Sequence, residues 1–172
     1  MCRVLVLFLM LVLSAAGRAE SSSEAPAASA FERFKALAGD WVDADGVLGK
    51  PGAVVANYRL TGGGSAVVET LMPGTAQEMS TVYHRDGKDM ALTHYCAAGN
   101  QPRMRARSVR GEALDFEFDG GTHLDPARDM HMHSMRFEFQ GPDAIRQTWQ
   151  AWKNGAPTEH APVFRLQRRP PA

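Results

Sequence analysis

Two histidines, His131 and His133, lie two residues apart in a stretch whose pattern is that of a β-strand. Side chains at positions i and i+2 of a strand point to the same face, so both imidazoles should face the same way. The residues that continue this parity are apolar: Met135, Phe137 and Phe139. Because the apolar face of a strand is normally the buried one, we expect His131 and His133 to point into the core. Buried imidazoles need hydrogen-bond partners or a bound group, so the pattern predicts a site.

A second pair of chemically active side chains follows the same rule. His94 and Cys96 share their parity with Met90 and Leu92 in the stretch 89–96, which places them on the expected interior face. The two stretches together could line one cavity with three imidazoles and a thiol. Such groups suit zinc or copper, although no Cys-x-x-Cys or helical His-Glu-x-x-His motif supports a metal. A small hydrophobic or polar ligand, a purely structural polar plug, and an enzyme using the histidines as acid and base are the alternatives.

Three further polar residues are candidates for the same cavity. Glu69 lies in the stretch 65–72, whose two faces are both apolar, so the sequence leaves its direction open. We expect it on the outer wall. If it points inward instead, burial raises the pKa of its carboxyl group, and it becomes a partner for a histidine or a general base. Asn100 and Gln101 follow Cys96 and could offer amide groups at the rim of the cavity, or simply form a turn.

The elements that must position these residues are short and separated by turns. The pattern predicts ten strands, at 40–44, 53–60, 65–72, 78–84, 89–96, 103–109, 113–118, 131–140, 144–152 and 162–168. Asp86-Gly87 and Asn154-Gly155 are preferred two-residue hairpin turns. Ten sequential antiparallel strands predict an all-β, up-and-down barrel, because closure removes exposed edges; a β-sandwich is the alternative. Apolar residues at helical spacing predict a short helix over 31–38 before the first strand.

One connection, 119–130, is too long for a tight hairpin and leads directly into the His131 stretch. It contains His123, which we expect to be exposed. His160, before the last strand, shares its parity with Phe164 and Leu166 and is a candidate for an inward position.

The first nineteen residues have the pattern of an export signal. Arg3 precedes an unbroken apolar run at 4–13, about half of the ~20 residues that a membrane span needs. Gly17 and Ala19 are small residues at the two key positions of a cleavage site before Glu20. We therefore expect a periplasmic or secreted protein without a membrane span. Residues 20–30 have the composition of a disordered linker, which leaves 31–172 as a single domain.

Charge and cysteine content bear on two further properties, nucleic-acid binding and disulfide formation. The full chain has 19 basic and 19 acidic residues, and loss of 1–19 removes Arg3 and Arg18 but no acid, leaving 17 against 19. A nearly neutral domain offers no electrostatic basis for binding nucleic acid. Cleavage would also remove Cys2, so the mature chain would keep only Cys96 and form no internal disulfide.

The segment Gly39-Asp40-Trp41 follows the predicted helix and opens the first strand. It resembles the Gly-x-Trp start of calycin barrels, which include lipocalins, fatty-acid-binding proteins and nitrobindin-like proteins. The resemblance implies a ligand-holding barrel in which a basic residue of the last strand, Arg165 or Arg168, packs across Trp41 as a cation–π contact.

More narrowly, three segments resemble a family of exported bacterial proteins whose activity is not established. They are 93–96 (Thr-His-Tyr-Cys), 99–104 (Gly-Asn-Gln-Pro-Arg-Met) and 131–133 (His-Met-His). The resemblance covers roughly 31–168 and implies a fold but no reaction. Nitrobindin-like proteins bind haem through a late-strand histidine. His160 is only an approximate positional match, so that activity does not carry over.

Overall fold

The computed structural model describes residues 24–46 and 52–170 and confirms a closed, antiparallel, ten-stranded barrel with one short helix. The elements are α1 (Glu24–Lys35), β1 (Gly39–Asp43), β2 (Val54–Thr61), the 3₁₀ turn η1 (Gly62–Gly64), β3 (Ala66–Leu71), β4 (Met79–Asp86), β5 (Asp89–Tyr95), β6 (Gln101–Arg110), β7 (Ala113–Thr122), β8 (His131–Phe139), β9 (Ala144–Lys153), β10 (Ala156–Pro157) and β11 (Val163–Arg168). The predicted export signal at 1–19 lies outside the described residues.

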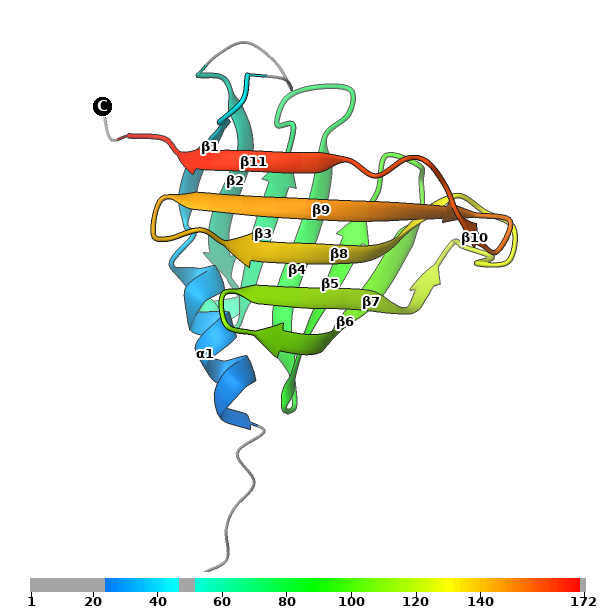
Figure 1. The fold of residues 1–172 in the computed structure, drawn as a ribbon, viewed down its shortest axis with the longest axis horizontal. Helices are drawn as coiled ribbons and strands as arrows, with labels where there is room; N and C mark the ends of the chain where they lie inside the picture. Colours follow the sequence, from blue (N-terminus) through cyan, green and yellow to red (C-terminus); the bar gives the residue numbers. More distant parts are fainter. Residues whose placement is uncertain (1–23, 47–51, 171–172) are drawn as a thin grey trace, which may run out of the picture.

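The barrel closes through its last strand. Consecutive strands pair from β1 to β9, after which β9 pairs with β11 and β11 pairs with β1. The two-residue strand β10 adds only to the end of β9. Figure 1 shows α1 against one end of the barrel, while the hairpin of β9 and β10 extends at the opposite end. Closure leaves each of the ten barrel strands with two neighbours, as the strand pattern predicted.

The helix begins at Glu24, earlier than the pattern predicted, and so includes residues that we assigned to a disordered linker. It ends at Lys35 rather than at residue 38. The reason for the early start lies in two alanines: Ala27 and Ala30 are buried on the same face as Phe31 and Phe34, at helical spacing. Alanine has the highest helix propensity, and its small side chain lets a helix pack closely. The linker prediction was therefore wrong for residues 24–30.

The end of the barrel beside α1 is sealed by aromatic and basic side chains. Trp41 is fully buried, and its Nε1 donates to the carbonyl oxygen of Leu37 at 2.8 Å. The Arg168 guanidinium lies 4.6 Å from the Trp41 ring, which confirms the predicted cation–π contact for one of the two candidate arginines. Arg165 instead pairs with Asp45 at 2.9 Å. Phe34, also fully buried, stacks on a core tyrosine of β4.

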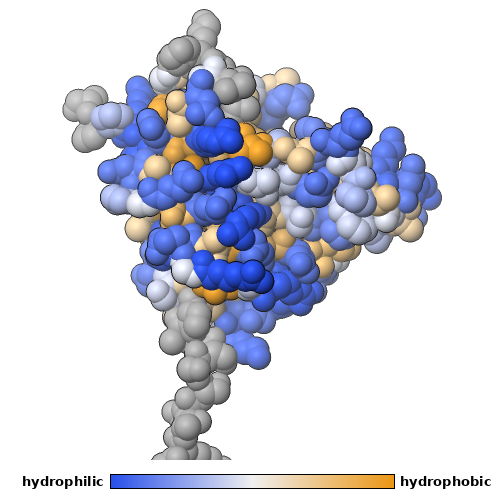
Figure 2. All heavy atoms as spheres, viewed as in Figure 1, coloured by the Kyte–Doolittle hydropathy of each residue, from blue (hydrophilic) through white to orange (hydrophobic). Residues whose placement is uncertain are grey.

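The outer wall of the barrel is mostly hydrophilic on the face shown in Figure 2, with scattered apolar positions. No helix in the described part of the chain is long and apolar enough to cross a membrane.

Candidate functional site

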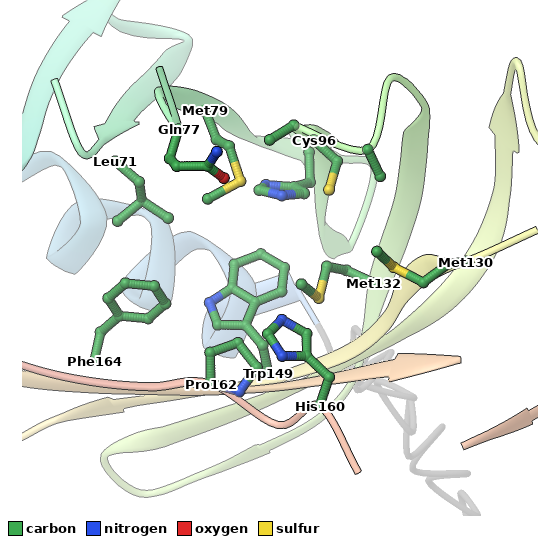
Figure 3. A pocket seen from close by; sticks show the side chains of 13 residues that line it. Leu71, Gln77, Met79, Cys96, Met130, Met132, Trp149, His160, Pro162 and Phe164 are labelled. Carbon is green, nitrogen blue, oxygen red and sulfur yellow. The ribbon is translucent and has the colours of Figure 1, made fainter. Parts of the chain in front are cut away.

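A pocket of about 380 Å³ opens at the barrel end opposite α1 (Figure 3). Strand directions place it there: Met132 near the start of β8 lines it, whereas Phe139 at the end of β8 contacts Phe34 of α1. Its wall is mostly apolar, formed by Leu71, Met79, Ala97, Ala98, Met130, Met132, Trp149, Pro162 and Phe164. Four other side chains complete it: Gln77, His94, Cys96 and His160. A concave, mainly apolar pocket with a few polar groups is typical of small-molecule sites.

His94 is the buried polar group of this pocket. It lies on β5 and is 1% exposed. Its Nδ1 is 2.9 Å from Thr81 Oγ1, and its ring centre is 4.8 Å from that of Trp149. Its Nε2 is buried and has no hydrogen-bond partner among the described residues. Burial lowers the pKa of His94 to about 4, so the imidazole is neutral at pH 7.

Glu69 points inward, so our expectation of an exposed position on the wall was wrong. Its cross-strand neighbours explain this direction, because β3 pairs Glu69 with Tyr58 of β2 on one side and Thr81 of β4 on the other. Tyr58 Oη donates to Oε1 at 2.5 Å, and Tyr83 Oη donates to Oε2 at 2.8 Å. Gln147 Nε2 also donates to Oε1. These donors satisfy a carboxylate that would otherwise be costly to bury.

Two routes connect Glu69 to the pocket. On one, Trp149 Nε1 donates to Gln147 Oε1 at 2.9 Å, and Gln147 donates to Glu69. On the other, Thr81 lies between Glu69 and His94. Burial raises the pKa of Glu69, and hydrogen bonds from its neighbours, Thr81 included, oppose that rise. We call Tyr58, Glu69, Thr81, Tyr83 and Gln147 the Glu69 network.

His131 and His133 do not line the pocket, contrary to our expectation. The pairing of β8 with β9 shifts between Met132 and Ser134, a bulge that adds one residue and breaks the alternation of side chains. Met132 lines the pocket as a result. The expected four-residue cluster is therefore not formed, and the described residues hold no group of three His, Cys, Asp or Glu side chains placed to bind a metal.

The two histidines form a pair of their own outside the pocket. His131 is fully buried; its Nδ1 is 2.9 Å from the carbonyl oxygen of Asp129, and its Nε2 is 3.0 Å from His133 Nδ1. His133 lies between two parallel rings, with centroid distances of 3.8 Å to Trp152 and 5.1 Å to Phe118. Partial burial and the neighbouring His131 lower the pKa of His133.

The predicted rim residues also lie outside the pocket wall. Asn100 Nδ2 donates to the carbonyl oxygen of Met130 at 2.8 Å, which ties the β5–β6 turn to the segment before β8. Gln101 accepts a hydrogen bond from Thr122. His123 is exposed, as predicted, and its ring lies 3.1 Å from the carbonyl oxygen of Gly99. His160 is largely exposed but borders the pocket.

Sequence reasoning missed two kinds of site residue. Met130 and Met132 were not candidates, because Met132 has the opposite parity to the two histidines and a bulge leaves no mark in an alternating pattern. Trp149 shares its parity with Ile145 and Gln147, and this pattern predicts a core residue rather than a site residue. The sequence does contain a signal for Trp149, because Gln147 is a polar residue on the same inward face of the strand. In the structure, Gln147 accepts the hydrogen bond of the Trp149 indole.

Comparison of the chain with models of known protein families and with curated proteins finds no match. The pocket itself is therefore the basis for assigning a function.

Proposed function

We propose that this is an exported protein that binds a small, mainly apolar organic molecule in the pocket lined by His94 and Trp149. The observation that carries the proposal is the unpartnered Nε2 of His94 in a mainly apolar wall. A buried polar atom without a partner is costly, and a ligand that hydrogen-bonds to it removes that cost.

The volume and the wall support an organic ligand. About 380 Å³ falls within the range of small-molecule pockets and is far more than a metal ion needs. Methionines supply three of the wall residues, Met79, Met130 and Met132, and their unbranched thioether chains adapt to ligands of different shape. A zinc or copper site has less support, because His131 and His133 lie away from His94 and Cys96.

The test uses N-phenylnaphthylamine, a neutral apolar fluorophore whose emission rises on leaving water. We expect saturable binding of one fluorophore per chain. Cys96→Trp should abolish it, because Cys96 borders the pocket and a bulky indole there occupies the cavity. Tyr95→Trp is the matched control, since the adjacent Tyr95 is 50% exposed and does not line the pocket. Absence of binding to the unsubstituted protein, or unchanged binding by folded Cys96→Trp, would overturn the proposal.

A further inference from the structure

We infer that the pocket selects neutral ligands that carry a hydrogen-bond donor, a hydroxyl or an N–H group, which donates to Nε2 of His94. This inference rests on the proposed function and specifies the chemistry of its ligand. It follows from the direction in which each hydrogen bond of the Glu69 network runs, starting from the groups that can only donate.

The Trp149 indole fixes the first direction. An indole N–H can only donate, so the atom of Gln147 that faces it at 2.9 Å is the amide oxygen. The amide nitrogen of Gln147 then faces Tyr58 Oη at 2.7 Å and Glu69 Oε1, and it donates to both. Tyr58 Oη accepts from Gln147 and therefore gives its own hydrogen to Glu69.

The Glu69 carboxylate is the acceptor on which the network ends. Oε1 accepts hydrogen bonds from Tyr58 Oη and Gln147 Nε2, and Oε2 accepts one from Tyr83 Oη at 2.8 Å. With donors on both oxygens, the arrangement satisfies an ionised carboxylate, which has only acceptor sites. A proton on Oε1 would instead confront the hydrogens of Tyr58 and Gln147.

Thr81 connects the Glu69 carboxylate to His94, so the direction of its hydrogen bonds determines which nitrogen of His94 carries the hydrogen. Its hydroxyl has one hydrogen, and Thr81 lies directly across from Glu69 in the paired strands β3 and β4. That hydrogen can go to His94 or to the Glu69 side of the network, where Thr81 lowers the pKa of Glu69 and of Tyr83. Hydrogen bonds to ionised acceptors are about twice as strong as neutral ones, so the hydroxyl donates to the carboxylate. Thr81 Oγ1 then accepts from Nδ1–H of His94. In a neutral imidazole the other nitrogen, Nε2, carries a lone pair and no hydrogen.

The pocket wall also argues against charged ligands. None of the described residues that line it is lysine or arginine, and His94 is neutral because burial lowers its pKa to about 4. His160, the other imidazole of the wall, is largely exposed at the border of the pocket. A carboxylate or phosphate group that reached His94 would therefore find no buried cation and would meet the lone pair of Nε2, which repels it. A neutral hydroxyl or N–H meets neither penalty.

A ligand must displace a side chain to reach Nε2, because this atom is shielded from solvent. Met79 and Met132 are the flexible neighbours that line the same cavity. Figure 3 shows both thioether chains beside the cavity. We therefore expect a change in the rotamer of Met79 or Met132 to expose Nε2 to a ligand.

The first experiment measures the protonation pattern of His94 directly. Nitrogen chemical shifts from NMR of the isotope-labelled protein at pH 7 should show Nδ1 bearing the hydrogen and Nε2 without it. Thr81→Val removes the acceptor on Nδ1, and the shifts of His94 should then change toward the mixture seen for free imidazole. A hydrogen on Nε2 in the unsubstituted protein would overturn the inference whether or not any ligand binds.

The second experiment compares matched ligands by calorimetry. Thymol and para-cymene differ only by one hydroxyl group, so thymol should bind about tenfold more tightly, the effect of one well-made hydrogen bond. Thymol methyl ether, which has no donor, should bind no better than para-cymene. The cuminate anion and the cuminylamine cation should both bind more weakly than thymol. In His94→Phe the preference for thymol over para-cymene should disappear.

The outcomes separate the two proposals. If para-cymene equals thymol, or if either ion binds more tightly than thymol, the inference fails, while binding of N-phenylnaphthylamine still supports an apolar ligand site. If the fluorophore does not bind, the proposed function fails and the preference between ligands loses its basis.

Discussion

The two ends of the barrel differ in whether their buried polar groups have hydrogen-bond partners. At the end beside α1, the Trp41 indole donates to Leu37, and the Arg168 guanidinium donates to the carbonyl oxygens of Ala36 and Ala38. At the pocket end, His94 has one nitrogen paired and one unpaired beside a cavity of about 380 Å³. Donors that have acceptors stabilise a fold, whereas a cavity beside a buried nitrogen without a partner leaves a hydrogen bond for a ligand to make.

The largest effect that distinguishes the two ends should come from Phe34→Ala. Phe34 is fully buried at the closed end and packs against four aromatic rings: Tyr83, Phe116, Phe137 and Phe139. Its removal should lower the free energy of unfolding by about 3–5 kcal/mol, as for other large-to-small core substitutions. Urea denaturation measures this loss. Affinity for N-phenylnaphthylamine should change less than twofold at a temperature where the variant stays folded.

Phe164→Ala is the counterpart at the pocket end. Phe164 is 7% exposed and lines the pocket, so its removal should weaken fluorophore binding and cost less stability than Phe34→Ala. Equal losses of stability for the two variants, with binding unchanged in both, would remove the distinction between the ends.

Acid should destabilise the protein through its pocket end. The pKa of His94 is about 4 in the folded protein, against 6.5 for the free side chain. The unfolded chain therefore binds a proton below pH 6.5 that the folded chain takes up only near pH 4. The free energy of unfolding falls as the pH falls through this window, by roughly 3 kcal/mol in total. Denaturation curves at pH 7, 6, 5 and 4 measure the loss, spanning the two pKa values.

Two other groups have shifted pKa values and also change the stability in acid. His133 has a lowered pKa and adds a smaller loss of the same sign. Glu69 has a raised pKa and acts in the opposite direction, because its folded form holds a proton more tightly. The difference between the unsubstituted protein and His94→Phe isolates the part due to His94. A difference that stays constant from pH 7 to pH 4 would contradict the assignment.

Glu69→Gln should have a somewhat smaller effect on stability but should reach the pocket. The amide group replaces one acceptor oxygen by a donor, which confronts the hydrogens of Tyr58, Tyr83 or Gln147. We expect a loss of about 2 kcal/mol, the cost of leaving a buried donor unsatisfied. The preference for thymol over para-cymene should also shrink, because Thr81 is then free to donate to His94. Glu117→Gln, at an exposed pair with Arg107, is a control that should change neither quantity appreciably.

The two ends also differ in how much of their structure could be predicted from the sequence. Gly39-Asp40-Trp41 and a late-strand arginine predicted the closed end, since a local motif and one long-range contact define it. At the pocket end, parity correctly placed His94 and Cys96 at the cavity. Parity failed for His133 because a bulge adds a residue without changing the apparent pattern.

Glu69 shows a different reason for failure. Its direction depends on donors from three other strands, Tyr58, Tyr83 and Gln147, and no local pattern in its own strand records them. A buried carboxylate becomes acceptable only when such partners exist, and partnership across strands requires the register. The prediction of where the helix begins was wrong for a simpler reason. Alanines that pack on a core cannot be distinguished by composition alone from alanines in a linker.

The smallest predicted effect tests the bulge itself. His133→Ala and Met132→Ala alter adjacent residues of β8, one stacked on Trp152 outside the pocket and the other lining it. His133→Ala should cost about 1 kcal/mol, the value of a half-buried aromatic contact, and leave fluorophore affinity unchanged. Met132→Ala should weaken fluorophore binding roughly fivefold, because the ligand loses apolar contacts worth about 1 kcal/mol. Strict alternation from His131 onward predicts the reverse, with His133 in the pocket and Met132 outside. Fluorescence titration of the two variants therefore decides between the bulged strand and a regular one, and with it which side chains a ligand meets.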